Sequence, residues 1–402
     1  MDYICYEEIA MNKFFLFTFL VFTLLNLSCN DNYDFSNPLD SQAALQAPTN
    51  LKVVSMTTTQ VSLSWDDPNK DSDYPNAYTG FTIEQSTNGT TFVVVKTLSS
   101  NASSTTITGT YDSTTTYYSR VQAKTAINKS GYSNMVNSRI SFPGMVFVQG
   151  GTFQMGSNDA NDYGASPPHS VTVGSFNIDK YEITYEKWTD VYNWGLTHGY
   201  TDLPAGQNGY SPNGTNNPVT SVNRCDILKW CNARSEKDGL TPVYYTSSTL
   251  ATIYRTGQLD LAPDAMKWTA NGYRLPTEAE WEFSARGGNN SQGYTYSGSN
   301  TIDNVAWCSN NSGNTTHTVG TKTANELGIY DMSGNVWEWC WDWYGTYSSS
   351  TQTDPKGATS GSYSVLRGGS FNYYDGVCRV ACRYTFDPYS RYDSGGFRCT
   401  RD

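Results

Sequence analysis

The sequence has no excess of basic residues and few charged residues of either sign. Of 402 residues, 26 are Lys or Arg and 37 are Asp or Glu, which gives a formal net charge of -11. Proteins that bind nucleic acid place clustered Lys and Arg side chains against the phosphate backbone, and this chain has no such basic stripe. The composition therefore excludes nucleic acid as a partner, and the negative charge is sufficiently explained by solubility.

Charged residues make up only 16% of the chain, which argues against a helical bundle. Aromatic residues reach 14%, with 30 Tyr, and there are 34 Gly. This composition is typical of loop-rich folds in exported binding proteins, whose polar surface comes from Ser, Thr, Asn and Tyr. The length predicts two or three folded units.

None of the nine cysteines forms the CxxC pairs of a zinc ribbon. Seven of them follow residue 200, so in an oxidising compartment some would pair and at least one would be left over.

The longest apolar run, Phe14 to Leu27, is too short to cross a membrane comfortably. It follows Lys13 and ends at Ser28-Cys29, and this arrangement resembles a bacterial lipoprotein signal, in which Cys29 becomes the lipidated first residue. An ordinary signal peptide or anchor is the alternative. We expect residues 1–28 to be a signal region with translation starting at Met11, and the protein to be exported and anchored by lipid to the outer surface of a bacterial membrane.

Residues 29–46 are polar and predict a lipidated tether. Residues 47–142 change to short alternating runs separated by turn residues, which predicts an antiparallel sandwich. Trp65 on the second predicted strand and Tyr117 late in the segment resemble positions of a fibronectin type III domain. An all-β domain of this kind is expected to act as a spacer.

A different set of motifs occupies residues 143–402. These motifs, taken in order, resemble the formylglycine-generating-enzyme (sulfatase-modifying-factor) family. The matching segments are Met145–Gly156, Asp179–Thr184, Asn217–Val219, Tyr273–Glu282, Gly328–Trp339, Arg367–Phe371 and Gly396–Cys399. The resemblance implies an irregular α+β, C-type-lectin-like domain over residues 143–402.

Two of these motifs also carry their own structural signals. Thr277 and Glu280 have the spacing of a capping box, which predicts a short helix that packs through Trp281. Trp337 and Trp339 stand two residues apart, so in an extended segment they would point to one face.

The segment from Asp331 to Glu338 combines two carboxylates with a turn, an oxygen-rich arrangement that suits Ca²⁺. In the resembling family the matching segment binds calcium. Carried over, this implies side-chain oxygens from Asp331 and Glu338 and backbone carbonyls at Gly334 and Val336. The alternative is that the carboxylates cap backbone amides.

The family's catalytic cysteine pair is not intact in this sequence. Aligned from Phe371, the first position of the pair is Tyr373 and the second is Cys378. Thiolate chemistry on a metal needs both sulfurs, so we expect no enzyme activity and no copper. Pairing Cys378 with Cys382 is an alternative, but its spacing differs from the family's and Cys382 lies in a run that looks unconstrained. The resemblance also implies a structural disulfide between Cys231 and Cys399.

The segment 372–395 interleaves aromatic and small polar residues and contains no Lys, Glu, Gln, Met or Trp. Rigid Tyr and Phe beside adaptable Ser, Asp, Asn and Gly are the chemistry of antibody loops. The segment resembles the variable region of proteins that are diversified by retroelements, such as the Treponema variable protein. The predicted ligand-binding residues are Tyr373, Tyr374, Asp375, Val377, Tyr384, Thr385, Phe386, Asp387, Tyr389, Ser390, Tyr392, Asp393 and Ser394.

These features predict a surface lipoprotein that binds a protein or glycan ligand on another cell or host surface, without catalysis. Its aromatic binding residues are expected to be exposed. Two other interpretations stay open, an inactive structural or assembly lipoprotein of the same family and a formylglycine-generating oxidase.

Overall fold

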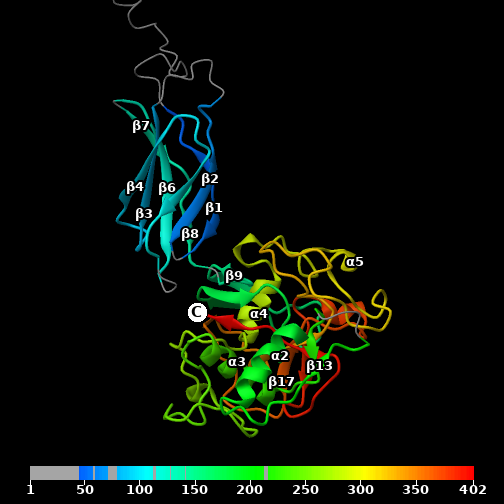
Figure 1. Ribbon diagram of the computed structural model, residues 1–402. Helices are drawn as coiled ribbons and strands as arrows, with labels where there is room; N and C mark the ends of the chain where they lie inside the picture. Colours follow the sequence, from blue (N-terminus) through cyan, green and yellow to red (C-terminus); the bar gives the residue numbers. More distant parts are fainter. Residues whose placement is uncertain are drawn as a thin grey trace, which may run out of the picture. The chain divides into compact units, whose positions relative to one another are not determined.

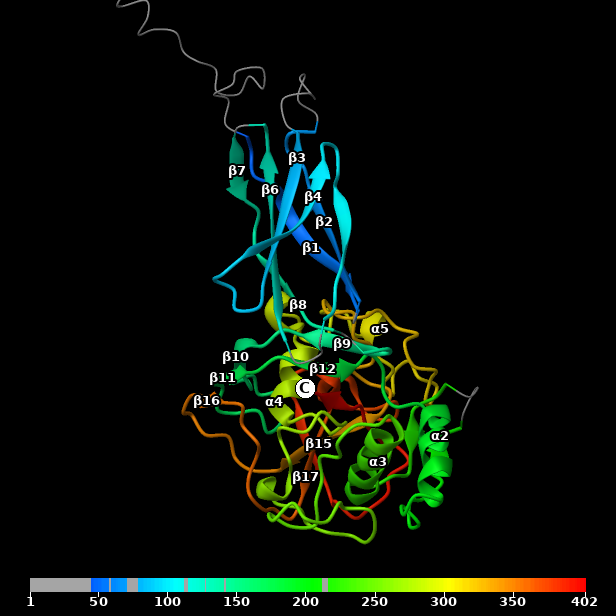
Figure 2. The ribbon, with the colours of Figure 1, turned by 60° about the vertical axis from the view of Figure 1, so that its left-hand side comes forward.

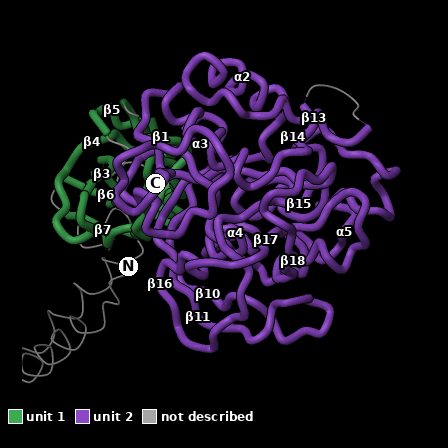
Figure 3. The backbone as a smooth tube through the Cα atoms, turned by 90° about the horizontal axis from the view of Figure 1, so that it is seen from below, with its two compact units in different colours: residues 1–140 green, residues 141–402 purple. Residues whose placement is uncertain are grey.

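A computed structural model describes residues 45–57, 59–70, 79–111, 115–126, 128–140, 142–211 and 216–402. The chain forms two compact units, Met1–Ile140 and Ser141–Asp402, which Figure 3 draws in different colours. The signal region and Cys29 lie outside the described residues. Among the helices that are described, none has the length and apolar character needed to cross a membrane.

The first unit is a sandwich of two antiparallel sheets (Figure 1). One sheet has the order β1 (Thr49–Met56), β2 (Gln60–Asp66), β5 (Ser104–Thr108). The other has the order β4 (Val93–Ser99), β3 (Gly80–Ser86), β6 (Tyr117–Lys124), β7 (Lys129–Tyr132), and β8 (Val136–Ser138) also pairs with β6. The predicted antiparallel sandwich is confirmed.

Alternation along β2 explains the core of this sandwich. Val61, Leu63 and Trp65 are buried in one cluster, because successive side chains of a strand point to opposite faces. The Trp65 ring meets Phe81 edge-on, with 5.4 Å between ring centroids. Trp65 thus lies on the second strand, as predicted, and its ring is part of the core.

The second unit combines short helices, small sheets and long connections, as predicted for an irregular α+β domain. Its α-helices are α2 (Tyr185–Leu196), α3 (Arg224–Lys237), α4 (Glu278–Ala285) and α5 (Ile302–Val305). Its 3₁₀ turns are η2 (Pro263–Ala265), η3 (Gly288–Asn290) and η4 (Asp375–Cys378).

The strands described in the second unit form four small sheets. The largest has the order β18 (Arg383–Phe386), β17 (Ser364–Arg367), β15 (Trp337–Trp343), β19 (Gly395–Gly396). One three-stranded sheet has the order β20 (Thr400–Arg401), β12 (Phe176–Asp179), β9 (Met145–Val148). Another has the order β10 (Gly151–Met155), β11 (His169–Val173), β16 (Gln352–Thr353). The last pairs β13 (Gln207–Asn208) with β14 (Val219–Thr220).

Strand β15 divides the core of this unit, and Figure 2 shows it beside β17 with α4 nearby. Trp337, Trp339 and Trp341 belong to one buried cluster, whereas Cys340 belongs to a second cluster that contains Trp281 of α4. The predicted shared face of Trp337 and Trp339 is confirmed. The predicted helix is confirmed too, because α4 starts after Thr277 in a capping box with Glu280.

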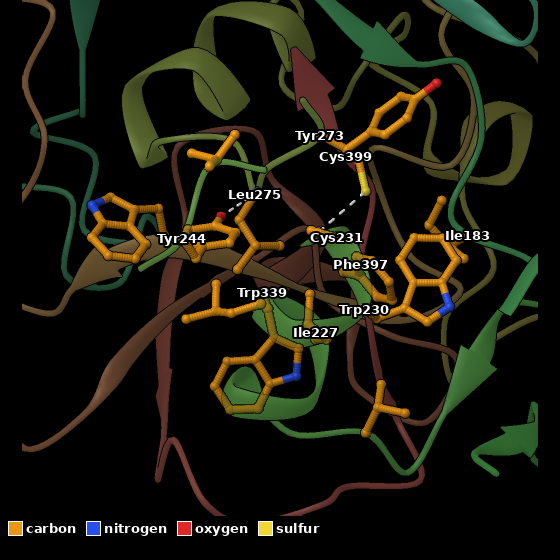
Figure 4. Close-up of a cluster of buried hydrophobic side chains, with 14 of the residues drawn as sticks. Ile183, Ile227, Trp230, Cys231, Tyr244, Tyr273, Leu275, Trp339, Phe397 and Cys399 are labelled. Atoms are coloured by element: carbon orange, nitrogen blue, oxygen red, sulfur yellow. Dashed lines mark hydrogen bonds between the residues drawn. The ribbon is translucent and has the colours of Figure 1, made fainter. Parts of the chain in front are cut away.

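Figure 4 shows the interior of the larger cluster, where Trp230 of α3 meets Phe397 with 5.4 Å between ring centroids. Cys231 and Cys399 lie in the same cluster, and their sulfurs are 3.6 Å apart as free thiols. That distance exceeds the roughly 2.05 Å of a disulfide bond. The helix and the end of the chain are thus adjacent without a covalent link.

Candidate functional site

The β18-β17-β15-β19 sheet has two chemically different faces. On the face toward α4, Arg383, Arg367 and Glu338 stand in one row across three strands. Arg367 is fully buried and donates to two of the α4 carboxylates, to Glu278 at 2.8 Å and to Glu282 at 2.7 Å. Each buried charge in this row has a partner of opposite charge, so the row has a structural role in the packing of the sheet.

The opposite face carries a cluster of aromatic rings, which we call the aromatic face: Trp337, Tyr373, Tyr384, Phe386 and Tyr392. Tyr384 stacks on Trp337 with 5.0 Å between ring centroids, and Tyr373 meets Trp337 edge-on at 5.5 Å. Phe386 lies 3.8 Å from Tyr392 by the same measure. Adjacent rings of this kind present a rigid apolar surface with hydroxyl groups on it.

The predicted ligand-binding residues differ in exposure. Tyr374 (61%), Tyr389 (39%) and Asp393 are exposed. The half-buried group consists of Tyr373, Asp375, Tyr384, Thr385, Asp387, Ser390 and Tyr392. The buried group consists of Val377, Phe386 and Ser394.

The expectation that all the aromatic binding residues are exposed is therefore wrong. Phe386 is 7% exposed because β18 directs its ring onto Trp337 and Trp339, and Val377 is 3% exposed within the same core cluster. Ser394 is 5% exposed because its carbonyl accepts from the backbone N–H of Trp337 beside β19. These three residues support the face from beneath, so the prediction that they contact ligand is corrected.

Trp337 is part of the face, although our sequence prediction did not include it. It lies 36 residues before Tyr373, outside the segment 372–395. Its indole Nε1 is buried, and among the described residues it has no hydrogen-bond partner. Its position two residues from Trp339 was the available signal, but only the pairing of β15 with β17 and β18 brings it under Tyr384.

The second half of the segment is fastened to the start of α3. Asn223 donates to the carbonyl of Tyr389 at 2.9 Å, and Arg391 pairs with the buried Asp226 at 2.7 Å. The Tyr389 hydroxyl donates to Asp260, and burial together with this bond raises the pKa of Tyr389. The segment is held in one arrangement by a scaffold that does not belong to it.

The cysteines near the face are inaccessible. Cys378 is fully buried, and burial beside Cys308 and Cys382 raises its pKa well above the ordinary range. Cys382 is buried in the larger core cluster, which corrects the interpretation of its run as unconstrained. Tyr373 stands half-buried where the resemblance implies the first thiol, and burial raises its pKa. A raised thiol pKa opposes thiolate formation at neutral pH.

The predicted calcium segment is a buried, negatively charged loop. Both oxygens of Glu338 accept from Arg398, at 2.7 Å each, and the Trp281 indole donates to the same carboxylate. Asp331 accepts from the backbone of Gly320, and burial raises its pKa to about 6. Glu182 is also buried, and burial and the charges of Asp331 and Glu338 raise its pKa.

Three buried carboxylates, those of Glu182, Asp331 and Glu338, thus act on the single guanidinium of Arg398, and a cation would favour their ionised forms. In the part of the chain that the structure describes, no three His, Cys, Asp or Glu side chains come together as a metal-binding group. A cation here would consequently depend on backbone carbonyls in addition to carboxylates.

Comparison with known proteins identifies both units. The model of the sulfatase-modifying factor enzyme 1-like domain matches residues 132–402, about two thirds of the chain. The chain belongs to this family. Residues 46–139 match the fibronectin type III domain.

Members of the sulfatase-modifying factor family and related solved structures differ in their named activities. The chain is 30% identical to the formylglycine-generating enzyme of Streptomyces coelicolor, over 64% of this chain and 89% of that protein. It is 41% identical to the "Chaperone protein LppX" of Paenibacillus barcinonensis, over 50% of this chain and 71% of that protein.

Among solved structures, Treponema denticola variable protein 1 aligns with a TM-score of 0.54 and 31% identity, over 67% of this chain and 96% of that one. The crystal structure of CarF aligns with a TM-score of 0.52 and 29% identity, over 64% of this chain and 97% of that one. The predicted resemblance to the formylglycine-generating-enzyme family and to the variable protein is therefore confirmed. The similar proteins are named as an enzyme, a chaperone and a variable protein.

Proposed function

We propose that this family member is a surface-exposed lipoprotein that binds protein or glycan ligands through the aromatic face, without catalysis. The observation that carries the proposal is the ring cluster itself, since Tyr373, Tyr384 and Tyr392 reach solvent from a rigid base of Trp337 and Phe386. Interface energy usually concentrates on such anchored aromatic side chains. Tyr374, Tyr389 and Asp393 of the same segment are exposed and are available to a ligand.

The absence of a usable thiol pair supports binding over catalysis. Tyr373 has no sulfur, and Cys378 is fully buried with a raised pKa. We expect the purified protein not to convert a sulfatase-type cysteine peptide to formylglycine with copper supplied. Turnover above a no-protein control would contradict this, and activity gained by Tyr373→Cys would show that the missing thiol was the only defect.

The binding proposal is tested with a glycan array and a displayed peptide library. The combined variant Tyr374→Ala, Tyr389→Ala and Asp393→Ala should lose at least tenfold in affinity for a ligand selected with the wild type, while its melting temperature stays within a few degrees. Tyr363→Ala is the matched control, because Tyr363 is 54% exposed and lies outside the segment 372–395. Unchanged affinity of the triple variant would contradict the proposal.

A second candidate function is assistance in the folding or assembly of another exported protein. It is favoured by the 41% identity to a protein named as a chaperone. The two functions differ in the state of the bound protein, because a chaperone holds unfolded chains whereas the proposed face binds a native ligand. Suppressed aggregation of a denatured enzyme by the wild type, retained by the triple variant, would favour the second function.

The proposed anchor is Cys29, and the proposed cofactor is Ca²⁺ held by Asp331, Glu338 and the carbonyls of Gly334 and Val336. The ion would neutralise the excess negative charge of the loop and thereby stabilise it. Metabolic labelling with a fatty acid tests the anchor, with Cys29→Ser as the unlabelled control. Protease treatment of whole cells then reports surface exposure, since protein on the outer surface is degraded.

A further inference from the structure

A cavity of about 390 Å³, lined by both charged and apolar residues, lies in the second unit. It is walled by the start of α4, the end of β15 and the exposed connection from residue 345 to 358. Arg383 lines it, while the next residue, Tyr384, belongs to the aromatic face. Since neighbouring strand residues point to opposite sides of a sheet, the cavity and the aromatic face are separate sites.

Two charged side chains of the cavity, Arg383 and Glu278, already have protein partners. Arg383 donates through Nη2 to Glu278 at 2.7 Å and through Nη1 to the carbonyls of Gly164 and Gly345. Glu278 also accepts from Arg367 and from the hydroxyl of Tyr347. Neither Arg383 nor Glu278 therefore needs a ligand.

Asp342 differs from Arg383 and Glu278, because one of its oxygens has no protein partner. It is 6% exposed and lines the cavity, and its Oδ2 accepts from the backbone N–H of Glu278 at 2.7 Å. Its Oδ1 has no hydrogen-bond partner among the described residues. Gly357 packs close above it, with a positive φ of +73°, and a Cβ there would come within 2.9 Å of Oδ1. Since Asp342 Oδ1 is not among the buried side-chain atoms that lack a partner, it faces the cavity, where water or a ligand can supply a donor.

The surrounding charges determine which donor fits. Burial is the largest cause that raises the pKa of Asp342. Glu278 and Glu280 of α4 raise it further and Arg383 lowers it, so that the pKa is about 8. The charges of Arg224 of α3 and Asp342 also interact. Lys356 lies at the wall with its Nζ 4.3 Å from the Trp268 ring centroid, so it is engaged elsewhere. His169 lines the cavity and packs edge-on against Tyr347.

We propose that this cavity binds a primary ammonium group, with Asp342 Oδ1 as its acceptor and the ring of Tyr347 beside its aliphatic stem. An anion is disfavoured because the arginine donors are already occupied. An ammonium supplies a donor to Oδ1, its positive charge stabilises the ionised form of Asp342, and the aromatic ring of Tyr347 favours a cation further. The ammonium could belong to a lysine side chain of a partner protein or to a free diamine, which offer the same chemistry.

Titration calorimetry on the full mature chain tests this with N-acetyl-lysine methylamide, 1,4-diaminobutane and the uncharged N-acetyl-norleucine methylamide. We expect saturable binding of an ammonium probe and none of the uncharged one. Tighter binding of the lysine derivative indicates a protein partner, and tighter binding of the diamine indicates a free amine. No binding of either ammonium probe at millimolar concentration, or equal binding of the uncharged probe, overturns the proposal.

Asp342→Asn should weaken ammonium binding at least tenfold, whereas Asp264→Asn, an exposed carboxyl outside the cavity, should leave it unchanged. In the wild type, binding at pH 7 should release close to one proton, because Asp342 must ionise, and affinity should rise about tenfold from pH 7 to pH 9. This second measurement holds even if the Asn variant fails to fold. Unchanged affinity in a folded Asn variant, or no proton release, overturns the proposal. None of these outcomes bears on ligand binding at the aromatic face.

Discussion

Tyr384 lies stacked on Trp337, with ring centroids 5.0 Å apart and planes inclined by 25°. The two residues come from β18 and β15, which do not pair directly but flank β17. The stack joins the segment 372–395 to the domain core, so a residue of the proposed binding surface also contributes to stability. This dual role distinguishes the half-buried Tyr384 from the exposed Tyr374 and Tyr389.

Tyr384→Ala should consequently lower the free energy of unfolding by about 2 kcal/mol, since it removes a half-buried ring from the cluster. Tyr374→Ala should change it by less than about 0.5 kcal/mol, because Tyr374 is 61% exposed. Tyr384→Phe keeps the ring and should be nearly neutral. Urea denaturation of the three variants measures the difference, and equal effects of the two alanine variants would contradict the stack's role.

The buried arginine row predicts a larger effect. Arg367→Met leaves Glu278 and Glu282 without a fully buried partner and should cost about 3 to 5 kcal/mol. The control is Arg255→Met, which breaks the pair with Glu236 at a site where the arginine side chain is 36% exposed, and which should cost less than about 1 kcal/mol. Thermal and urea unfolding measure the stability of both variants, and similar losses of stability would contradict this prediction.

Chelation tests the proposed cation. If Ca²⁺ binds the loop around Asp331, removal with EGTA should lower the melting temperature of the second unit, and added Ca²⁺ should restore it, because a ligand of the native state stabilises by mass action. Asp331→Asn should melt at a lower temperature that no longer responds to EGTA. A wild-type melting curve that is indifferent to EGTA removes the ion from the proposal.

Asp342 predicts a pH dependence of stability. Its folded-state pKa of about 8 lies above the roughly 3.9 of an unfolded chain, so its favourable contribution is present at low pH and is lost as the pH rises through that window. Relative to Asp342→Asn, the wild type should therefore lose stability between about pH 4 and pH 8. Parallel stability curves for the two proteins would show that Asp342 does not titrate in this range.

The proximity of Cys231 and Cys399 predicts that oxidation links them by a disulfide bond and stabilises the protein. Their sulfurs are 3.6 Å apart in the core, so oxidation requires only a small approach. The bond would close a loop of 168 positions, and chain entropy suggests a gain of about 4 to 5 kcal/mol. Alkylation followed by mass spectrometry should find both cysteines protected in oxidised protein and reactive after reduction and unfolding. Cys399→Ser should abolish the protection of Cys231.

Some of this architecture could be predicted from local sequence because the interactions involved are themselves local. The capping box of α4 needs only Thr277 and Glu280, three residues apart. The common face of Trp337 and Trp339 follows from strand geometry alone. The exposure of Phe386 could not be predicted this way, because its burial depends on Trp337 and Trp339, nearly fifty residues earlier in the chain.

By itself, the sequence determined the order of the two units, the short helix with its cap, the alternation of β15 and the family of the second unit. Only the tertiary structure decided which aromatic side chains reach solvent, and that Asp342 keeps an oxygen without a donor. The reason is physical. Caps and alternation arise between residues a few positions apart, whereas burial and charge balance depend on contacts such as Arg383 with Glu278, 105 residues apart, which exist only in the folded chain.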